Sequence, residues 1–77
     1  MNVELFMGKA RESIIRLSKG QEFVVKDLFE GHEWNSLSAE DRRGFGMRFK
    51  NAVKSGMFAD IEFVGRKQNN SSYYRKK

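Results

Sequence analysis

The sequence contains no cysteine and a single histidine, His32, among its 77 residues. The first absence excludes disulfides and thiolate metal sites, and one histidine cannot supply the four nitrogen or sulfur ligands of a structural zinc site. A Ser/His/Asp or Cys/His catalytic set cannot be assembled around it either. We therefore expect no metal, no cofactor, no small-molecule substrate and no enzymatic activity.

Long apolar runs are also missing, and the longest falls far short of the ~20 residues that span a bilayer. No charged segment followed by an apolar one opens the chain, so we expect a cytoplasmic protein with no membrane partner. We find no internal repeat and no Pro-, Gly- or Ser-rich linker. The sequence therefore predicts one domain over residues 1–77, with a disordered basic tail at 75–77. Its core has to come from packing, and 13% of the residues are aromatic.

Charge is distributed unevenly along the chain. Residues 1–41 carry five Lys or Arg and eight Asp or Glu, a net charge of −3, whereas residues 42–77 carry ten and two, a net charge of +8. Such a division concentrates positive potential on one part of the surface, which favours a polyanionic partner. A solvated basic surface without a partner is the alternative.

The first predicted helix begins after Asn2, which can cap it. Its apolar residues recur at spacings of three and four and so share one face. They are Val3, Phe6, Ala10, Ile14 and Leu17. Residues 18–20 end this helix, because Gly20 suits the left-handed conformation that follows a helix.

A longer helix is predicted from Ser38 to about Ser55, with Gly56 closing it. Ser38 is followed three residues later by Asp41, which matches an N-cap pattern and places acids at the positive end of the helix dipole. Two opposite faces result from the helical period. The apolar face holds Phe45, Phe49, Ala52 and Val53. The polar face holds Arg43, Met47, Lys50, Asn51 and Lys54.

Between these helices, residues 22–25 are β-branched and aromatic and predict a short strand. Residues 26–30 then predict one or two helical turns that end at Gly31. We expect residues 32–37 to be a connection in which Trp34 packs as an anchor between the second and third helices. Further along, residues 58–64 and 72–75 predict a hairpin with a polar tip.

This order of elements resembles the winged helix-turn-helix family. The resemblance rests on residues 21–29 as strand plus second helix, residues 38–56 as third helix and residues 58–74 as wing. It implies a small α+β fold of three helices with a short strand and a C-terminal β-hairpin wing. A narrower set of residues is similar to small uncharacterised proteins of Gram-positive bacteria and their phages, which bring no known activity. That set is Glu33, Trp34, Arg43, Gly46, Phe49, Lys50, Val53, Gly56 and Tyr74.

Members of the winged helix-turn-helix family typically lay the third helix in the major groove of DNA and the wing along the backbone or minor groove. The corresponding third-helix positions here are Arg43, Met47, Lys50, Asn51 and Lys54. The wing positions are Arg66, Lys67, Gln68 and Asn69. Arg can bond guanine O6 and N7, and Asn can bond adenine N6 and N7, so Arg43 and Asn51 are the candidates for base contacts. Lys50 and Lys54 suit phosphate.

Two glycines, Gly44 and Gly46, stand inside the predicted third helix, where each costs roughly 1 kcal/mol relative to Ala. They allow two interpretations. Either glycine permits a close approach of the first helix or of a phosphate, or the helix begins later than Ser38.

We therefore expect nucleic-acid binding, with double-stranded DNA as the partner of a small regulator or accessory factor, for example of a mobile element. Tyr73 and Tyr74 face opposite sides of a strand, so one packs in the core and the other is left for a phosphate or for stacking on an unpaired base. The alternative is a protein-interaction module that docks an acidic partner or a second copy. It would be favoured if Met47 and Val64 join exposed aromatic residues in a patch of several hundred Å².

Overall fold

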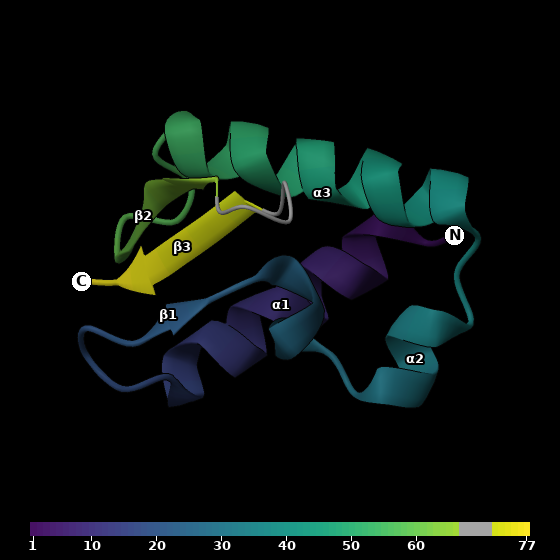
Figure 1. Cartoon of the computed structure of the whole chain (residues 1–77), viewed down its shortest axis with the longest axis horizontal. Coiled ribbons are helices and arrows are strands. Elements are labelled where there is room, and N and C mark those ends of the chain that lie inside the picture. Colours follow the sequence, from purple (N-terminus) through teal and green to yellow (C-terminus); the bar gives the residue numbers. More distant parts are fainter. Residues whose placement is uncertain (67–71) are drawn as a thin grey trace.

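The computed structural model describes residues 1–66 and 72–77, and these form α-helices, one 3-10 helix and a β-sheet. The elements are α1 (Val3–Arg16), β1 (Glu22–Phe23), the 3-10 helix η1 (Val25–Leu28), α2 (Gly31–Asn35), α3 (Ala39–Lys54), β2 (Ile61–Arg66) and β3 (Ser72–Lys76). The antiparallel strands follow the order β1-β3-β2, so the last strand lies in the middle of the sheet. The architecture is the predicted α+β class, compatible with a winged helix-like fold. Figure 1 shows α3 along the top, with the hairpin below its C-terminal end.

Helix α1 begins where the sequence predicts. The side-chain oxygen of Asn2 accepts a hydrogen bond from the backbone N–H of Leu5 at 3.0 Å, which satisfies one of the free donors of the first turn. The predicted apolar face is confirmed as the buried one, because four of its members lie in the core or pack against it. These are Phe6, Ala10, Ile14 and Leu17.

The segment between β1 and α3 differs from the prediction. The turns predicted over residues 26–30 are replaced by η1, which ends at Leu28, and α2 occupies Gly31–Asn35 where a connection was expected. Phe29 between them is extended, with φ −128° and ψ 156°. Its ring stacks on Trp34 at 5.5 Å and 10°. The packing of Phe29 on Trp34 decides the local conformation here, although residues 26–30 have some helical propensity.

Trp34 packs as the predicted anchor, although it stands in a helix. Besides Phe29, it meets the ring of Phe45 on α3 edge-on, at 6.3 Å between centroids. An ion pair between Lys9 and Glu33 joins α2 to α1. Because α2 has only five residues, these contacts and not its own hydrogen bonds hold it in place.

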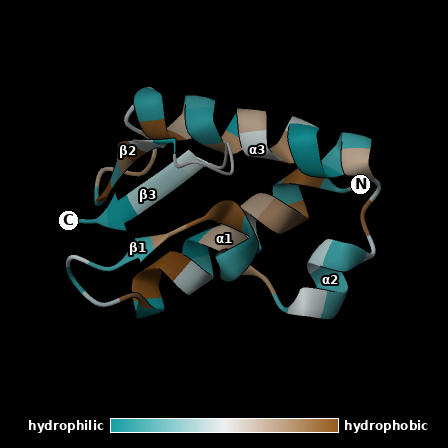
Figure 2. Ribbon diagram, viewed as in Figure 1, coloured by the Kyte–Doolittle hydropathy of each residue, from teal (hydrophilic) through white to brown (hydrophobic). Residues whose placement is uncertain are grey.

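Helix α3 has the predicted start, end and faces. Ser38 Oγ accepts a hydrogen bond from the backbone N–H of Asp41 at 3.1 Å, and Gly56 follows the helix with φ +89°. All four residues of the predicted apolar face are buried. They are Phe45, Phe49, Ala52 and Val53. In Figure 2 hydrophilic residues dominate the outward side of this helix.

Neither a later start of α3 nor a close approach of α1 explains the two glycines of α3. The helix begins directly after Ser38, so the later start is wrong. A Cβ atom built on Gly44 or Gly46 meets nothing within 4 Å, so α1 does not approach closely at either position. Both glycines therefore border open space.

The hairpin is less regular than predicted. Phe63 is paired with Tyr74 and Gly65 with Tyr73, so Val64 forms a β-bulge on β2. Tyr74 is 1% exposed and is the core member of the tyrosine pair, while Tyr73 is half-buried. The predicted wing residues Lys67, Gln68 and Asn69 lie outside the described residues.

Residues 75 and 76, expected in a disordered tail, belong to β3. The ammonium of Lys76 donates to the backbone oxygen of Ile14 at 2.8 Å and to Asp60 Oδ2 at 2.9 Å. The backbone N–H of Lys77 donates to the carbonyl of Asp60 at 2.8 Å. This end of the chain is therefore fastened to the C-terminal turn of α1.

We predict that Gly44→Ala and Gly46→Ala each raise the free energy of unfolding by about 1 kcal/mol, because alanine limits the unfolded chain and adds no clash in a helix. Urea unfolding followed by circular dichroism measures the change. Gly56→Ala is the matched control: with φ +89° at this position, the same substitution should destabilise the fold. A destabilised Gly44→Ala protein would contradict the helical assignment.

Candidate nucleic-acid interface

A row of basic side chains follows one side of α3 and continues onto β2. We call Arg43, Lys50 and Lys54 of α3, with Arg66 of β2, the basic stripe. Spacings of seven and four residues bring the three helical members to the same side of the helix. Arg43, Lys54 and Arg66 are exposed and Lys50 is half-buried, so all four border solvent.

Phe63 of β2 lies beneath the two lysines of the stripe. The Lys50 ammonium is 4.7 Å from the centroid of its ring, and the Lys54 ammonium is 5.9 Å away. Both distances allow a cation–π attraction, which holds the flexible lysine side chains over the hairpin. The aromatic residue therefore joins the hairpin to the charged side of α3.

The pKa of Lys50 is lowered, first by partial burial and then by the positive charges of Lys54 and Arg66. Like charges disfavour the ammonium form, so the shift shows that these cations lie within each other's field. Positive groups gathered in this way attract a polyanion, because binding one relieves their mutual repulsion.

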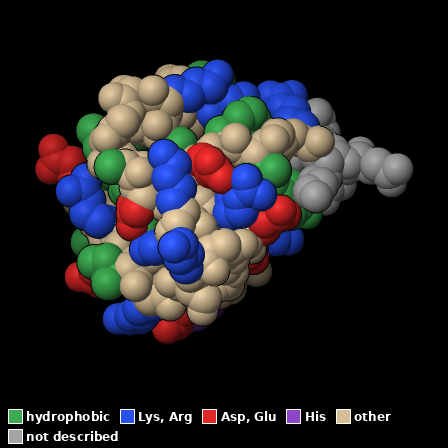
Figure 3. Space-filling model, turned by 90° about the vertical axis from the view of Figure 1, so that its left-hand side faces the viewer, with side chains coloured by type: hydrophobic (Ala, Val, Ile, Leu, Met, Phe, Trp, Pro, Cys, Tyr) green, Lys and Arg blue, Asp and Glu red, His purple; other side chains and the backbone are tan. Residues whose placement is uncertain are grey.

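Cations elsewhere on the hairpin are neutralised by partners. Arg75 forms an ion pair with Glu62 at 2.6 Å, and Lys76 forms one with Asp60 at 2.9 Å. Figure 3 shows this end of the molecule: basic side chains gather along the top, over α3, and basic and acidic side chains alternate below. Arg75 and Lys76 are therefore paired with acidic residues of the hairpin and the turn before it.

The other predicted residues of α3 lie further round the helix. Met47 is 68% exposed, and Asn51 is exposed as well. Val64, at the bulge of β2, is 39% exposed. Met47 and Val64 are therefore both exposed, on two different elements, and the large hydrophobic residues exposed in the described part of the chain include no aromatic one.

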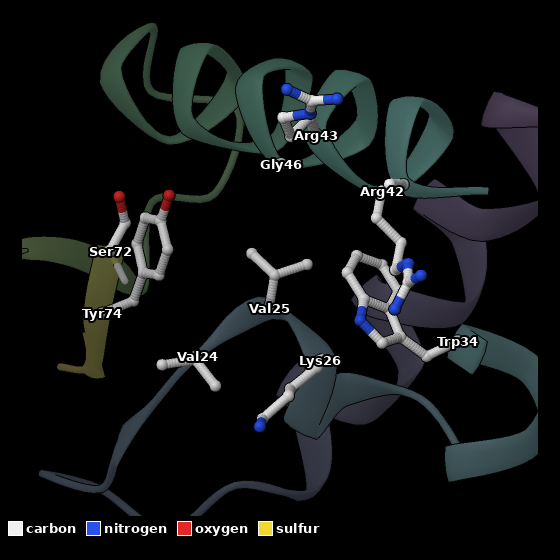
Figure 4. Close-up of a pocket in the computed structure, with 10 residues that line it drawn as sticks. Val24, Val25, Lys26, Trp34, Arg42, Arg43, Gly46, Ser72 and Tyr74 are labelled. Carbon is white, nitrogen blue, oxygen red and sulfur yellow. The ribbon is translucent and has the colours of Figure 1, made fainter. Parts of the chain in front are cut away.

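A groove that the sequence did not predict lies beside the stripe, between α3 and η1. Figure 4 shows the residues that line it. Its volume is about 710 Å³. We call it the α3–η1 groove, and the residues that give it chemical character are Lys26, Trp34, Arg42, Arg43, Gly46 and Tyr74. Arg43 belongs to both the groove and the stripe, so the two surfaces are continuous.

Arg42 is the unusual member of this groove. It lines the groove at the same end as Trp34 (Figure 4). Its Nε atom is buried and makes no hydrogen bond to any residue that the structure describes. Buried donors in folded proteins nearly always have an acceptor, so this N–H is an exception among the described residues.

Tyr74 closes the opposite end of the groove. Its phenol points from β3 toward α3 (Figure 4), and burial raises the pKa of Tyr74 to about 12. The hydroxyl therefore stays protonated at neutral pH and can donate a hydrogen bond. The sequence identified Tyr74 as one of a pair but gave no signal for Lys26 or Arg42, because their meeting depends on the path of residues 24–35.

Residues 1–66 and 72–77 contain neither a candidate membrane-spanning helix nor a candidate metal site. None of the helices there is long and apolar enough to cross a bilayer. The same residues contain no group of three or more His, Cys, Asp or Glu side chains that could hold a metal ion.

Comparisons with known proteins agree with these features. A family model described as "Domain of unknown function (DUF1413)" matches residues 8–76. A search of curated proteins finds no match. Among solved structures, the chain is similar to "SCCmec type IV LP1413 - nucleic acids binding protein", with a TM-score of 0.72 and 26% identity. The match covers 99% of this chain and 93% of that chain, so it includes both the helices and the sheet.

We predict that Arg66→Gln raises the pKa of Lys50 toward its usual value, because one of the two positive neighbours is removed. Titration of the lysine side-chain signals by NMR measures this pKa. Arg16→Gln, at the far end of α1, is the control and should leave it unchanged. Equal values for Lys50 in both variants would mean that Arg66 is not part of the stripe.

Proposed function

The chain belongs to the family described as a domain of unknown function, DUF1413, and we propose that it binds nucleic acid through the basic stripe. The observation that carries the proposal is the meeting of Lys50 and Lys54 over Phe63, with Arg66 close enough to lower the pKa of Lys50. The helix and the strand that follows it place like charges together at a cost that a polyanion removes. A phosphate backbone presents such charges at regular spacing.

The similarity to a solved protein supports the same proposal. That protein is described as binding nucleic acids, and the likeness covers nearly the whole of both chains. At 26% identity the shared fold is accompanied by related sequence. We infer a binding protein and not an enzyme, acting as a small regulator or accessory factor.

Duplex DNA is the partner we propose for α3. An α-helix fits the major groove, and Arg43 and Asn51 carry the side chains that bond guanine and adenine edges. In this arrangement Lys50 and Lys54 contact phosphates, and Arg66 brings the wing to the backbone or the minor groove. Gly46 keeps the helix surface low between Arg43 and Lys50.

We predict that binding of labelled duplex falls steeply with salt, with a log–log slope of about −0.9 for each phosphate neutralised. The double variant Lys50→Gln, Lys54→Gln should reduce the magnitude of this slope by about 1.8 and weaken binding uniformly across sequences. Fluorescence anisotropy at several salt concentrations measures both quantities.

The control is Arg16→Gln, Lys19→Gln, which removes the same charge from the end of α1 and the turn after it. Equal losses in the two double variants would show that net charge and not the stripe determines binding. Absence of binding to both duplex and single-stranded DNA at low salt would overturn the proposed function.

A further inference from the structure

We propose that the α3–η1 groove is a binding site for one unstacked nucleotide, with the phosphate at Arg42 and the base against the aromatic walls. The inference rests on the proposed function and extends it from the stripe to a second, concave surface. The same chemistry is offered by a free nucleoside monophosphate and by an unpaired nucleotide within a strand.

The charge of the groove selects an anion. Three of its lining residues are cationic, Lys26 from η1 and Arg42 and Arg43 from α3. The lining residues within the described part of the chain include no carboxylate. A small anionic group entering here meets positive charge from both sides of the groove.

Arg42 supplies the specific position for a phosphate. Its Nε is buried without a hydrogen-bond acceptor among the described residues, and Arg42 lines the groove at the same end as Trp34. Guanidinium donors match the oxygens of a phosphate group in two parallel hydrogen bonds.

The remaining walls suit a flat apolar ring. Trp34, Val24 and Val25 supply this surface, while Tyr74, which is 1% exposed, closes the end of the groove opposite Trp34 (Figure 4). Unstacked bases bind proteins through such aromatic and apolar faces, with polar groups fixing their edges. The Tyr74 hydroxyl is a protonated donor that can serve this purpose.

The volume of the groove suits a ligand of the size of one nucleotide. A volume of about 710 Å³ falls within the roughly 300–1,000 Å³ of pockets that bind drug-sized ligands. Paired bases within a duplex show only their edges to a protein. Ring faces become available when a nucleotide leaves the stack, and Arg43 connects that position to the phosphates along the stripe.

Gly46 provides a test that removes none of the residues described. Its Cβ position is open, so Gly46→Leu adds a side chain to the groove wall without a clash. Gly44→Leu is the matched control, because it adds the same side chain to the same helix, also in open space, at a position outside the groove lining. Both changes favour the helix, so loss of folding does not confuse the result.

Trp34 is the single tryptophan and lines the groove, so its fluorescence reports an occupant. We predict that thymidine 5′-monophosphate and an oligothymidylate strand both quench this fluorescence in the unmodified protein. Gly46→Leu should weaken both interactions at least roughly tenfold, because the added side chain occupies the groove, and Gly44→Leu should not. Arg42→Gln should abolish the preference for the monophosphate over thymidine.

Equal binding of the strand by the Gly46→Leu and Gly44→Leu proteins would overturn the inference, as would unchanged Trp34 fluorescence. Quenching by an acidic peptide but not by the monophosphate would also overturn it, in favour of a protein partner. Duplex binding with no response to unpaired nucleotides leaves the proposed function standing and removes only the groove site. Failure of every nucleic acid to bind at low salt removes both.

Discussion

The packing of Phe49 against Tyr74 is the contact on which the rest of the structure depends. The two rings are perpendicular, with centroids 5.0 Å apart, and both side chains are almost fully buried. One ring belongs to α3 and the other to the central strand, so this contact fixes the helix on the sheet. Phe23 and Phe63 then meet Tyr74 from the two outer strands. In a short chain without disulfides, aromatic burial of this kind supplies most of the stability.

The two surfaces of interest are consequences of that packing. Because Tyr74 holds β2 below α3, Phe63 comes to lie under the lysines of the helix, and the stripe gains Arg66 from the hairpin. On its other side, Tyr74 ends the α3–η1 groove. The basic stripe and the α3–η1 groove therefore both depend on the buried Tyr74, and Arg43 lies where the two surfaces meet.

The parts that could be predicted from the sequence are those governed by local rules. Caps at Asn2 and Ser38 and the helical period located α1 and α3 and their buried faces, because hydrogen bonds within one turn decide them. The path of residues 26–35 could not be predicted, since stacking of Phe29 on Trp34 overrides local propensity there. The groove was missed for the same reason: Lys26 and Arg42 meet only through that path. The helical part of the stripe, by contrast, was visible as a polar face.

The strand order also bears on how this chain acquires its fold during synthesis. β3 is central and pairs with both β1 and β2, yet it is the last strand to leave the ribosome. Glu22 pairs with Arg75 across most of the sequence, so the sheet closes a long loop when it forms. The helices can form while the chain is still growing, but no strand has its partner until residues 72–76 emerge. The sheet therefore forms only once the last of the described strands has been made.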